Sequence, residues 1–259
     1  MGRSSVRYAF KIAYDGIRYF GFARQPGLPT IEGELLKALK ECGLCHDPAE
    51  ARYRVASRTD RGVSAMGQVV ALDMLKRPNI SAINAHLPDD ISILSTTEVQ
   101  PSFDPWRMAL RKHYRYKCGA PEGFDLKKAR GAAKLLLGRH DFWSFCKHEQ
   151  GRPTLGELEQ VKISGRKILT SDFVAPAFLW QQVRRMVGAL LMVGVGKFAL
   201  EDFKLMLKQP QNHLPRPANP EGLALVKIEY KEISFKDQRV SKKCENLLKR
   251  IKAKKSIYH

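Results

Sequence analysis

The sequence contains no long hydrophobic run. Its longest apolar stretch, residues 186–195, is bounded by Arg185 and Lys197, and it falls well short of the ~20 residues that a membrane-spanning helix needs. The first residues also lack the apolar segment of a secretory signal, so we expect no export and a cytoplasmic location. A membrane-embedded protein is therefore excluded as an interpretation.

Cysteines are few and odd in number, with five in the chain. An odd count without a secretory signal argues for reduced thiols rather than a disulfide framework. Cys42, Cys45 and His46 have the spacing of c-type haem attachment or of half a zinc site. Haem attachment would need export, and the remaining cysteines are scattered. We therefore expect no metal, and interpret Cys42 as a small apolar residue near a helix end.

Acidic residues are scarce relative to basic ones. The chain holds 45 Lys and Arg against 26 Asp and Glu, which gives a net charge of +19. Such a charge attracts polyanions and predicts salt-sensitive binding of nucleic acid, although anionic membranes and acidic proteins would be attracted too. The hydrophobic content of 44% is that of a soluble globular protein.

Hydrophobic periodicity predicts the order strand, helix, strand, strand, helix, strand twice along the chain. The first copy consists of strand 6–14, a helix capped by Thr30, strands 53–56 and 68–75, helix 81–86 and strand 91–94. The second consists of strand 111–118, a helix capped by Asp125, strands 161–164 and 172–175, a long helix over 179–191, helix 202–207 and strand 223–230. The order predicts an α+β fold built from two ferredoxin-like halves.

Composition divides the chain into three parts. Pro101, Asp104 and Pro105 mark a boundary, so we predict an N-terminal α/β domain over 1–104 and a C-terminal one over 105–235. The remainder, 236–259, is a tail with nine basic and two acidic residues. A helical pattern through Cys244, Leu247, Leu248 and Ile251 would let this tail dock one face and project its lysines. Both a phosphate-contacting tail and a solvated terminal helix fit this composition.

The segment from Ser57 to Ala65 places one carboxylate, Asp60, between two arginines in a turn. Strand-like stretches lie on both sides, and loops at strand ends carry many catalytic groups. Ordinary turn chemistry is the alternative, with Gly62 supplying a positive φ. The segment alone leaves both interpretations open.

Two further candidates lie in the second half. Arg184 falls at the edge of the apolar stripe of the long helix, on one face with Trp180 and Gly188. A guanidinium there either lies at the surface or needs a carboxylate such as Asp60. On the strand at 111–118, two tyrosines face the same side, where they either pack in the core or stack on a base.

Four separate segments of the chain match known motifs and follow one another in a fixed order. They are residues 13–35, which open Ala-Tyr-Asp-Gly; residues 57–69, similar to GRTDxGVHAxGQV; residues 112–116, similar to R/K-x-Y-x-Y; and residues 178–188, similar to FxxxxVRxxVG. Together they resemble the tRNA pseudouridine synthase A family over most of residues 8–230. The resemblance implies a pseudouridine synthase fold, with a continuous, mostly antiparallel central sheet, helices packed on it and a central active-site cleft.

The resemblance also implies a reaction. A uridine of tRNA is cut at its N-glycosidic bond, and the uracil is turned and rejoined through C5. Asp60 matches the essential aspartate, a nucleophile or an aid to cleavage, and Arg184 matches the arginine that pairs with it and keeps it ionised. Tyr114 matches the tyrosine that packs on the target base, and Arg58 the arginine that helps to displace the nucleotide from its stack.

Further expectations follow from the family. Arg24 and Tyr116 are candidates for RNA contact, no cofactor or metal is needed, and the enzyme is a homodimer acting on tRNA. The expected targets are positions 38, 39 and 40 of the anticodon stem-loop. The same chemistry at positions 27 and 28, or an RNA-binding protein without activity, is an alternative.

The chain departs from the bacterial pattern in several places. Ser64 stands where many relatives carry His, so we assign no acid or base role there. Residues 103–106 and 151–153 replace a Phe-His-Ala-Arg-like and a Ser-Arg-Thr-Pro-like run, the connection 119–124 is short, and the basic tail has no counterpart. These features resemble archaeal members more than bacterial ones, and they bear on the choice of uridine rather than on the chemistry.

Overall fold

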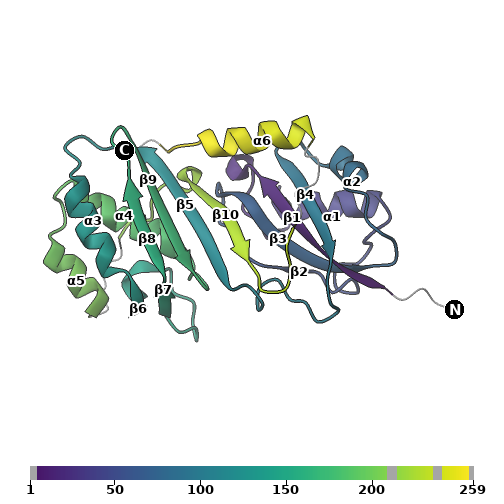
Figure 1. Ribbon diagram of the computed structural model, residues 1–259, viewed down its shortest axis with the longest axis horizontal. Coiled ribbons are helices and arrows are strands. Elements are labelled where there is room, and N and C mark those ends of the chain that lie inside the picture. The colour runs from purple at the N-terminus through teal and green to yellow at the C-terminus, as the bar shows by residue number, and fades with distance from the viewer. Residues whose placement is uncertain (1–4, 209–214, 236–240, 257–259) are drawn as a thin grey trace. The chain divides into compact units, whose positions relative to one another are not determined.

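A computed structural model describes residues 5–208, 215–235 and 241–256. The chain divides into two compact units (Figure 1): unit 1 comprises 1–110 and 224–253, and unit 2 comprises 111–223 and 254–259. Each unit combines helices with a mostly antiparallel sheet, which confirms the predicted α+β class. Within the described ranges, no helix has the length and apolar character needed to cross a bilayer.

Unit 1 is built on a sheet with the strand order β4-β1-β3-β10, and β2 adds to β3. Its elements are β1 (Val6–Tyr14), η1 (Gly16–Arg18), α1 (Ile31–Glu41), β2 (Arg54–Val55), β3 (Ser64–Met74), α2 (Ile80–His86), β4 (Ile91–Glu98), β10 (Leu223–Glu229) and α6 (Lys242–Ala253). Strand β1 pairs antiparallel with both β3 and β4, whereas β10 runs parallel to β3. The predicted first strand-helix-strand-strand-helix-strand order is therefore confirmed.

Local signals placed the first helix well. The Thr30 hydroxyl accepts a hydrogen bond from the Gly33 N–H at 3.2 Å, as the predicted N-cap requires. Ile31, Leu35 and Leu39 then point into the core. Helix α1 thus begins where the sequence indicates, because one side chain satisfies an N–H that the helix itself leaves unpaired.

Strand β3 begins at Ser64, earlier than the predicted start at Gln68. Its first residues, Ser64 and Ala65, pair with Ala224 and Leu225 of β10. This pairing joins residues that are far apart in sequence, so a local pattern does not reveal it. The earlier start matters because it leaves only a short loop between β2 and β3 to carry Asp60.

The predicted terminal helix is confirmed as α6, drawn in yellow in Figure 1. Cys244, Leu247 and Ile251 are buried against Ala13 of β1 and Leu94 of β4. The helix therefore covers one face of the unit 1 sheet through its apolar side. Lys236 and Arg239, which we counted in the basic tail, lie outside the described residues.

Unit 2 contains a sheet with the order β5-β9-β8 and a separate pair, β6-β7, all antiparallel. Its elements are β5 (Arg111–Gly119), α3 (Leu126–Leu135), β6 (Gly138–Asp141), η2 (Trp143–Phe145), β7 (Leu155–Leu158), β8 (Gln160–Ser164), β9 (Ile168–Ala175), α4 (Gln182–Gly194), α5 (Leu200–Lys208) and η3 (Pro220–Gly222). Helix α3 starts at its predicted cap, since the Asp125 carboxylate accepts the N–H groups of Lys127 and Lys128.

The units differ from the predicted segments 1–104, 105–235 and 236–259. From Ala224 onward, β10 belongs to unit 1 because it pairs with β3, and α6 follows because its apolar face packs on the same sheet. The short pair β6-β7 was not predicted, because each strand has four residues and carries no alternating pattern. The three-part division into domains stays a prediction.

Candidate active-site residues of the two units

Asp60 lies in the loop between β2 and β3 of unit 1, with a half-buried side chain. Its carbonyl oxygen accepts the Val63 N–H at 3.1 Å, which closes a turn. Gly62 has a φ of +80°, and Arg61 is not among the described residues with positive φ. This combination defines a type II turn, which requires a left-handed third residue. The predicted role of Gly62 is confirmed.

The backbone before Asp60 is fixed by buried polar groups. The Thr59 Oγ1 lies 2.8 Å from the hydroxyl of Tyr14, and the Thr59 carbonyl accepts the Phe22 N–H at 3.0 Å. The fully buried Gln68 donates through Nε2 to the Ser57 carbonyl at 2.5 Å and to the Tyr14 hydroxyl at 3.3 Å. The loop is thus held in one geometry before any substrate binds, as a catalytic group requires.

Three arginines lie on or near this loop, and all are exposed. Arg58 flanks Asp60 on one side. On the other side, the Arg61 guanidinium lies over the ring of Phe20, 4.1 Å from its centroid, which is cation–π geometry. Arg24 donates its N–H to the Glu32 carboxylate at 2.8 Å, with its side chain 3.7 Å from the same oxygen. The exposed guanidinium groups give this part of unit 1 a positive rim.

The two predicted tyrosines lie on β5 of unit 2 and are both buried. The ring of Tyr114 meets Phe178 edge to face, with centroids 5.1 Å apart. The hydroxyl of Tyr116 lies 2.7 Å from the Ser256 Oγ, and burial raises the pKa of Tyr116 to about 12. With 2% of its surface exposed, Tyr116 is a core residue. The RNA contact predicted for Tyr116 stays a prediction.

Arg184 is half-buried on α4 and is bound to the segment 216–218. Its Nε donates to the Ala218 carbonyl at 2.8 Å, and its own carbonyl accepts the Ala218 N–H at 2.9 Å. One turn further along, a Cβ on Gly188 would overlap the Arg216 carbonyl oxygen. The missing side chain of Gly188 therefore admits a close neighbour, and that neighbour is backbone.

The start of α4 corrects one expectation. Gln181 takes a left-handed conformation, with φ of +59°, and the helix begins at Gln182. Trp180 therefore precedes the helix and does not share its face with Arg184. It lies instead beneath a cation, with the Lys147 Nζ 3.9 Å from its ring centroid. Periodicity extended the helix too far because Leu179 continues the apolar stripe.

Sequence reasoning did not single out Lys112 as unusual. It is the first residue of β5 on the face that carries the two tyrosines, and its side chain is buried. Burial lowers the pKa of Lys112 to about 8. The available signal was its alternation with two aromatic residues on one strand face. Across the described residues, we find no group of three or more His, Cys, Asp or Glu side chains placed to hold a metal.

The predicted residues divide between the units: Arg24, Arg58 and Asp60 in unit 1, and Tyr114, Tyr116 and Arg184 in unit 2. A family model described as tRNA pseudouridine synthase matches residues 132–231.

Three archaeal relatives, each named tRNA pseudouridine synthase A, are similar over most of the chain. The protein of Thermococcus sibiricus is 42% identical over 233 residues, which cover 89% of this chain and 87% of the relative. That of Thermococcus kodakarensis is 41% identical over 243 residues, 92% and 90% of the two chains. That of Methanothermobacter thermautotrophicus is 39% identical over 226 residues, 86% and 81%.

Proposed function

The chain belongs to the tRNA pseudouridine synthase A family of isomerases, and we propose from that premise that it converts uridine to pseudouridine in tRNA. The observation that carries the proposal is the Asp60 loop. A carboxylate stands in a type II turn whose preceding residues are fixed by Tyr14 and Gln68. This network holds the carboxylate in a fixed position before substrate binds, as a catalytic group requires.

In this proposal Asp60 is the nucleophile: its carboxylate forms a transient covalent bond to the uridine as the N-glycosidic bond breaks, and that bond is released again before the product leaves. The N-glycosidic bond of the target uridine breaks, the uracil turns, a bond forms between C5 and C1′ of the ribose, and the proton on C5 moves to N1. The family resemblance implies that Arg184 pairs with Asp60. Arg184 is suited to this, because its Nε is already bound to the Ala218 carbonyl and its orientation is set.

Two residues prepare the nucleotide. Tyr114 packs on the target base, and Phe178 holds its ring at a fixed angle of 85°. Arg58 is exposed beside the catalytic loop, where its long side chain enters the space that an extruded nucleotide leaves behind. The net charge of +19 supplies the attraction for the phosphate backbone.

The finer assignments come from the family resemblance. They are modification at positions 38, 39 or 40 of the anticodon stem-loop, a homodimer, a cytoplasmic location and an exposed RNA contact at Arg24. No cofactor or metal enters the chemistry, because the reaction is an isomerisation without net redox change or group transfer.

The test is incubation with unmodified tRNA transcripts, followed by position-resolved detection of pseudouridine with a carbodiimide. We expect product at positions 38 to 40 with the natural chain. Asp60→Asn removes the charge at nearly constant size, and we expect no product while tRNA binding persists. Asp47→Asn is the matched control, because Asp47 is exposed and its bond from the Ala49 N–H is one that asparagine also accepts.

Three outcomes would contradict parts of the proposal. Product only at positions 27 and 28 would overturn the assignment of the target uridines but would leave the assignment of the reaction unchanged. Full activity of Asp60→Asn would remove Asp60 as the nucleophile. Tight tRNA binding without product on any transcript would identify an RNA-binding protein that lacks activity.

A further inference from the structure

The segment from Asp15 to Phe22 of unit 1 runs alongside the loop that carries Asp60. At one end, a Cβ on Gly16 would overlap the Val63 carbonyl oxygen, and the Gly16 N–H donates to the buried Ser64 hydroxyl at 3.2 Å. At the other end, Phe22 donates to the Thr59 carbonyl at 3.0 Å. Both ends of the Asp60 loop therefore contact the segment from Asp15 to Phe22, and a shift of this segment would move the loop.

Two adjacent buried carboxylates anchor the segment. Asp15 and Asp90 are 5% and 6% exposed, and the Asp15 N–H donates to the Asp90 carbonyl at 2.9 Å. The Tyr19 hydroxyl donates to the Asp90 carboxylate at 2.5 Å, and the Ile17 N–H donates to that of Asp15. Burial of a carboxylate is costly unless cations and donors surround it. The position of the segment thus depends on what compensates these two charges.

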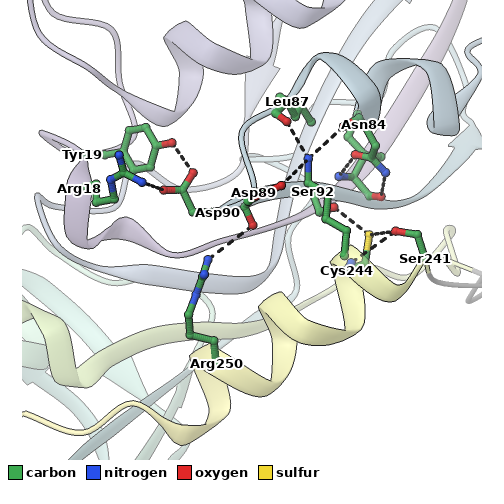
Figure 2. Close-up of polar contacts among 12 residues, drawn as sticks. Arg18, Tyr19, Asn84, Leu87, Asp89, Asp90, Ser92, Ser241, Cys244 and Arg250 are labelled. Atoms are coloured by element: carbon green, nitrogen blue, oxygen red, sulfur yellow. Dashed lines mark hydrogen bonds and ion pairs between the residues drawn. The ribbon is translucent and has the colours of Figure 1, made fainter.

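Each carboxylate has an arginine close by. Arg18 lies 3.7 Å from the Asp90 Oδ2, and it comes from the segment itself. Arg250 lies 3.3 Å from the Asp15 Oδ2, and it comes from α6. The same Arg250 donates to the Asp89 carbonyl at 3.5 Å, and Figure 2 shows it reaching up from the helix to this turn. One side chain of the terminal helix therefore contacts both chain segments that hold the anchor.

Helix α6 does not depend on Arg250 for its own position. Besides its apolar face, Lys243 donates to the carbonyls of Asn84 and Leu87 at 3.1 and 2.6 Å, where it meets the negative end of α2. The Cys244 Sγ lies 2.8 Å from the Ser92 hydroxyl, and Figure 2 shows the two side chains facing each other. Because these contacts fix the helix, loss of the Arg250 guanidinium leaves α6 in place and removes the ion pair to Asp15 together with the bond to the Asp89 carbonyl.

We propose that α6 braces the Asp60 loop through the Arg250–Asp15 ion pair, which makes Arg250 a positioning residue for the reaction. The inference rests on the proposed function, since it assumes that Asp60 is the catalytic group. Arg250 touches no substrate in this role: it holds Asp15, Asp15 holds Gly16, and Gly16 sets the Val63 end of the turn. Small displacements of a catalytic group lower rates strongly, so the brace acts on turnover rather than on tRNA affinity.

The first test compares Arg250→Gln with Lys249→Gln, which removes the same charge from the exposed neighbouring position. Pseudouridine formation is measured in single turnover at saturating enzyme, together with the Kd for tRNA and the unfolding temperature. We expect Arg250→Gln to slow the reaction about tenfold, a change of about 1.4 kcal/mol in barrier, with Kd changed less than threefold. Lys249→Gln should change the rate less than twofold, and Arg250→Lys should restore part of it.

A double-mutant cycle with Asp15→Asn identifies the route. If Arg250 acts by compensating the Asp15 charge, the second substitution makes that compensation unnecessary. Arg250→Gln should then slow the Asp15→Asn chain much less than it slows the natural chain. Equal slowing in both backgrounds would overturn the route through Asp15.

Hydrogen–deuterium exchange separates failure of the brace from failure of the proposed function, because it needs no substrate. We expect the amides of Gly16, Phe22 and Val63 to exchange faster in Arg250→Gln than in Lys249→Gln. Unchanged exchange would overturn the inference whatever the enzyme does. Faster exchange with an unchanged rate would overturn the role of Arg250 in turnover, and absence of product from the natural chain would instead refute the proposed function.

Discussion

Removal of one oxygen atom from Tyr14 is the sharpest test of how the Asp60 loop is held. Tyr14→Phe keeps the ring but deletes the hydroxyl that lies 2.8 Å from Thr59 Oγ1 and 3.3 Å from Gln68 Nε2. Gln68 keeps its bond to the Ser57 carbonyl at 2.5 Å, whereas Thr59 loses its hydroxyl partner. The perturbation therefore falls on the residue directly before Asp60.

The magnitude follows from these contacts. A buried hydrogen bond contributes about 0.5–1.5 kcal/mol net, and a buried polar group left without its partner costs about 1–3 kcal/mol. We therefore expect Tyr14→Phe to lower the free energy of unfolding by about 1–3 kcal/mol. In a chain of this size, each kcal/mol lowers Tm by roughly 2–4 °C. Urea denaturation and calorimetry measure both quantities, and single-turnover kinetics should show a slower reaction.

Tyr53→Phe is the matched control. The Tyr53 hydroxyl is also buried in unit 1, but within the described part of the chain it has no hydrogen-bond partner. Its removal should leave stability unchanged or raise it slightly, because a buried polar atom is lost without a broken bond. Equal destabilisation by the two substitutions, or a normal rate in Tyr14→Phe, would refute the view that the Tyr14 hydroxyl holds the loop.

Three further predictions follow from the two units. Gly188→Ala should lower the free energy of unfolding in urea by about 1–3 kcal/mol, because its Cβ overlaps the Arg216 carbonyl. The control, Gly131→Ala on α3, meets nothing within 4 Å and should raise the free energy of unfolding by about 0.5–1 kcal/mol. Destabilisation by both substitutions would refute the packing argument. Burial lowers the pKa of Lys112 from 10.5 to about 8. Between these two pH values the unfolded chain binds more protons than the folded chain, so the free energy of unfolding should rise with pH across that window. Lys112→Met should remove this rise when unfolding is compared at pH 8 and pH 10. The affinity for tRNA should fall steeply with ionic strength, and a flat response in filter binding between low and physiological salt would argue against a phosphate-dominated interface.

Local chemistry made much of this fold predictable. The caps at Thr30 and Asp125 act within three residues of themselves, so the sequence placed both helices correctly. The left-handed Gly62 was predictable for the same reason, because turn types impose it on a single position. Strand β1 was visible because its alternation spans nine residues.

Long-range pairing accounts for what could not be predicted. The start of β3 at Ser64 depends on β10, which lies at the other end of the chain. The burial of Tyr116 depends on Ser256 and on the close approach of Gly222, and neither is close to it in sequence. Likewise, the motifs indicated Asp60 but not its support, because Arg250 reaches Asp15 from a helix that the family pattern does not include.

The placement of β10 and α6 determines when unit 1 can finish folding during synthesis. Unit 1 is interrupted: the chain leaves it after Leu110, builds unit 2, and returns at Ala224. A nascent chain that has emerged as far as Leu223 already holds every motif residue, yet it lacks both the partner strand of Ser64 and the helix that reaches Asp15. Chains usually fold from the N-terminus as they emerge, but here the N-terminal part of unit 1 is completed only when residues 224–253 have been synthesised. Incomplete translation products that end before Ala224 would therefore keep the contacts of Tyr14 and Gln68 to the Asp60 loop but lack the β10 pairing and the Arg250 contact.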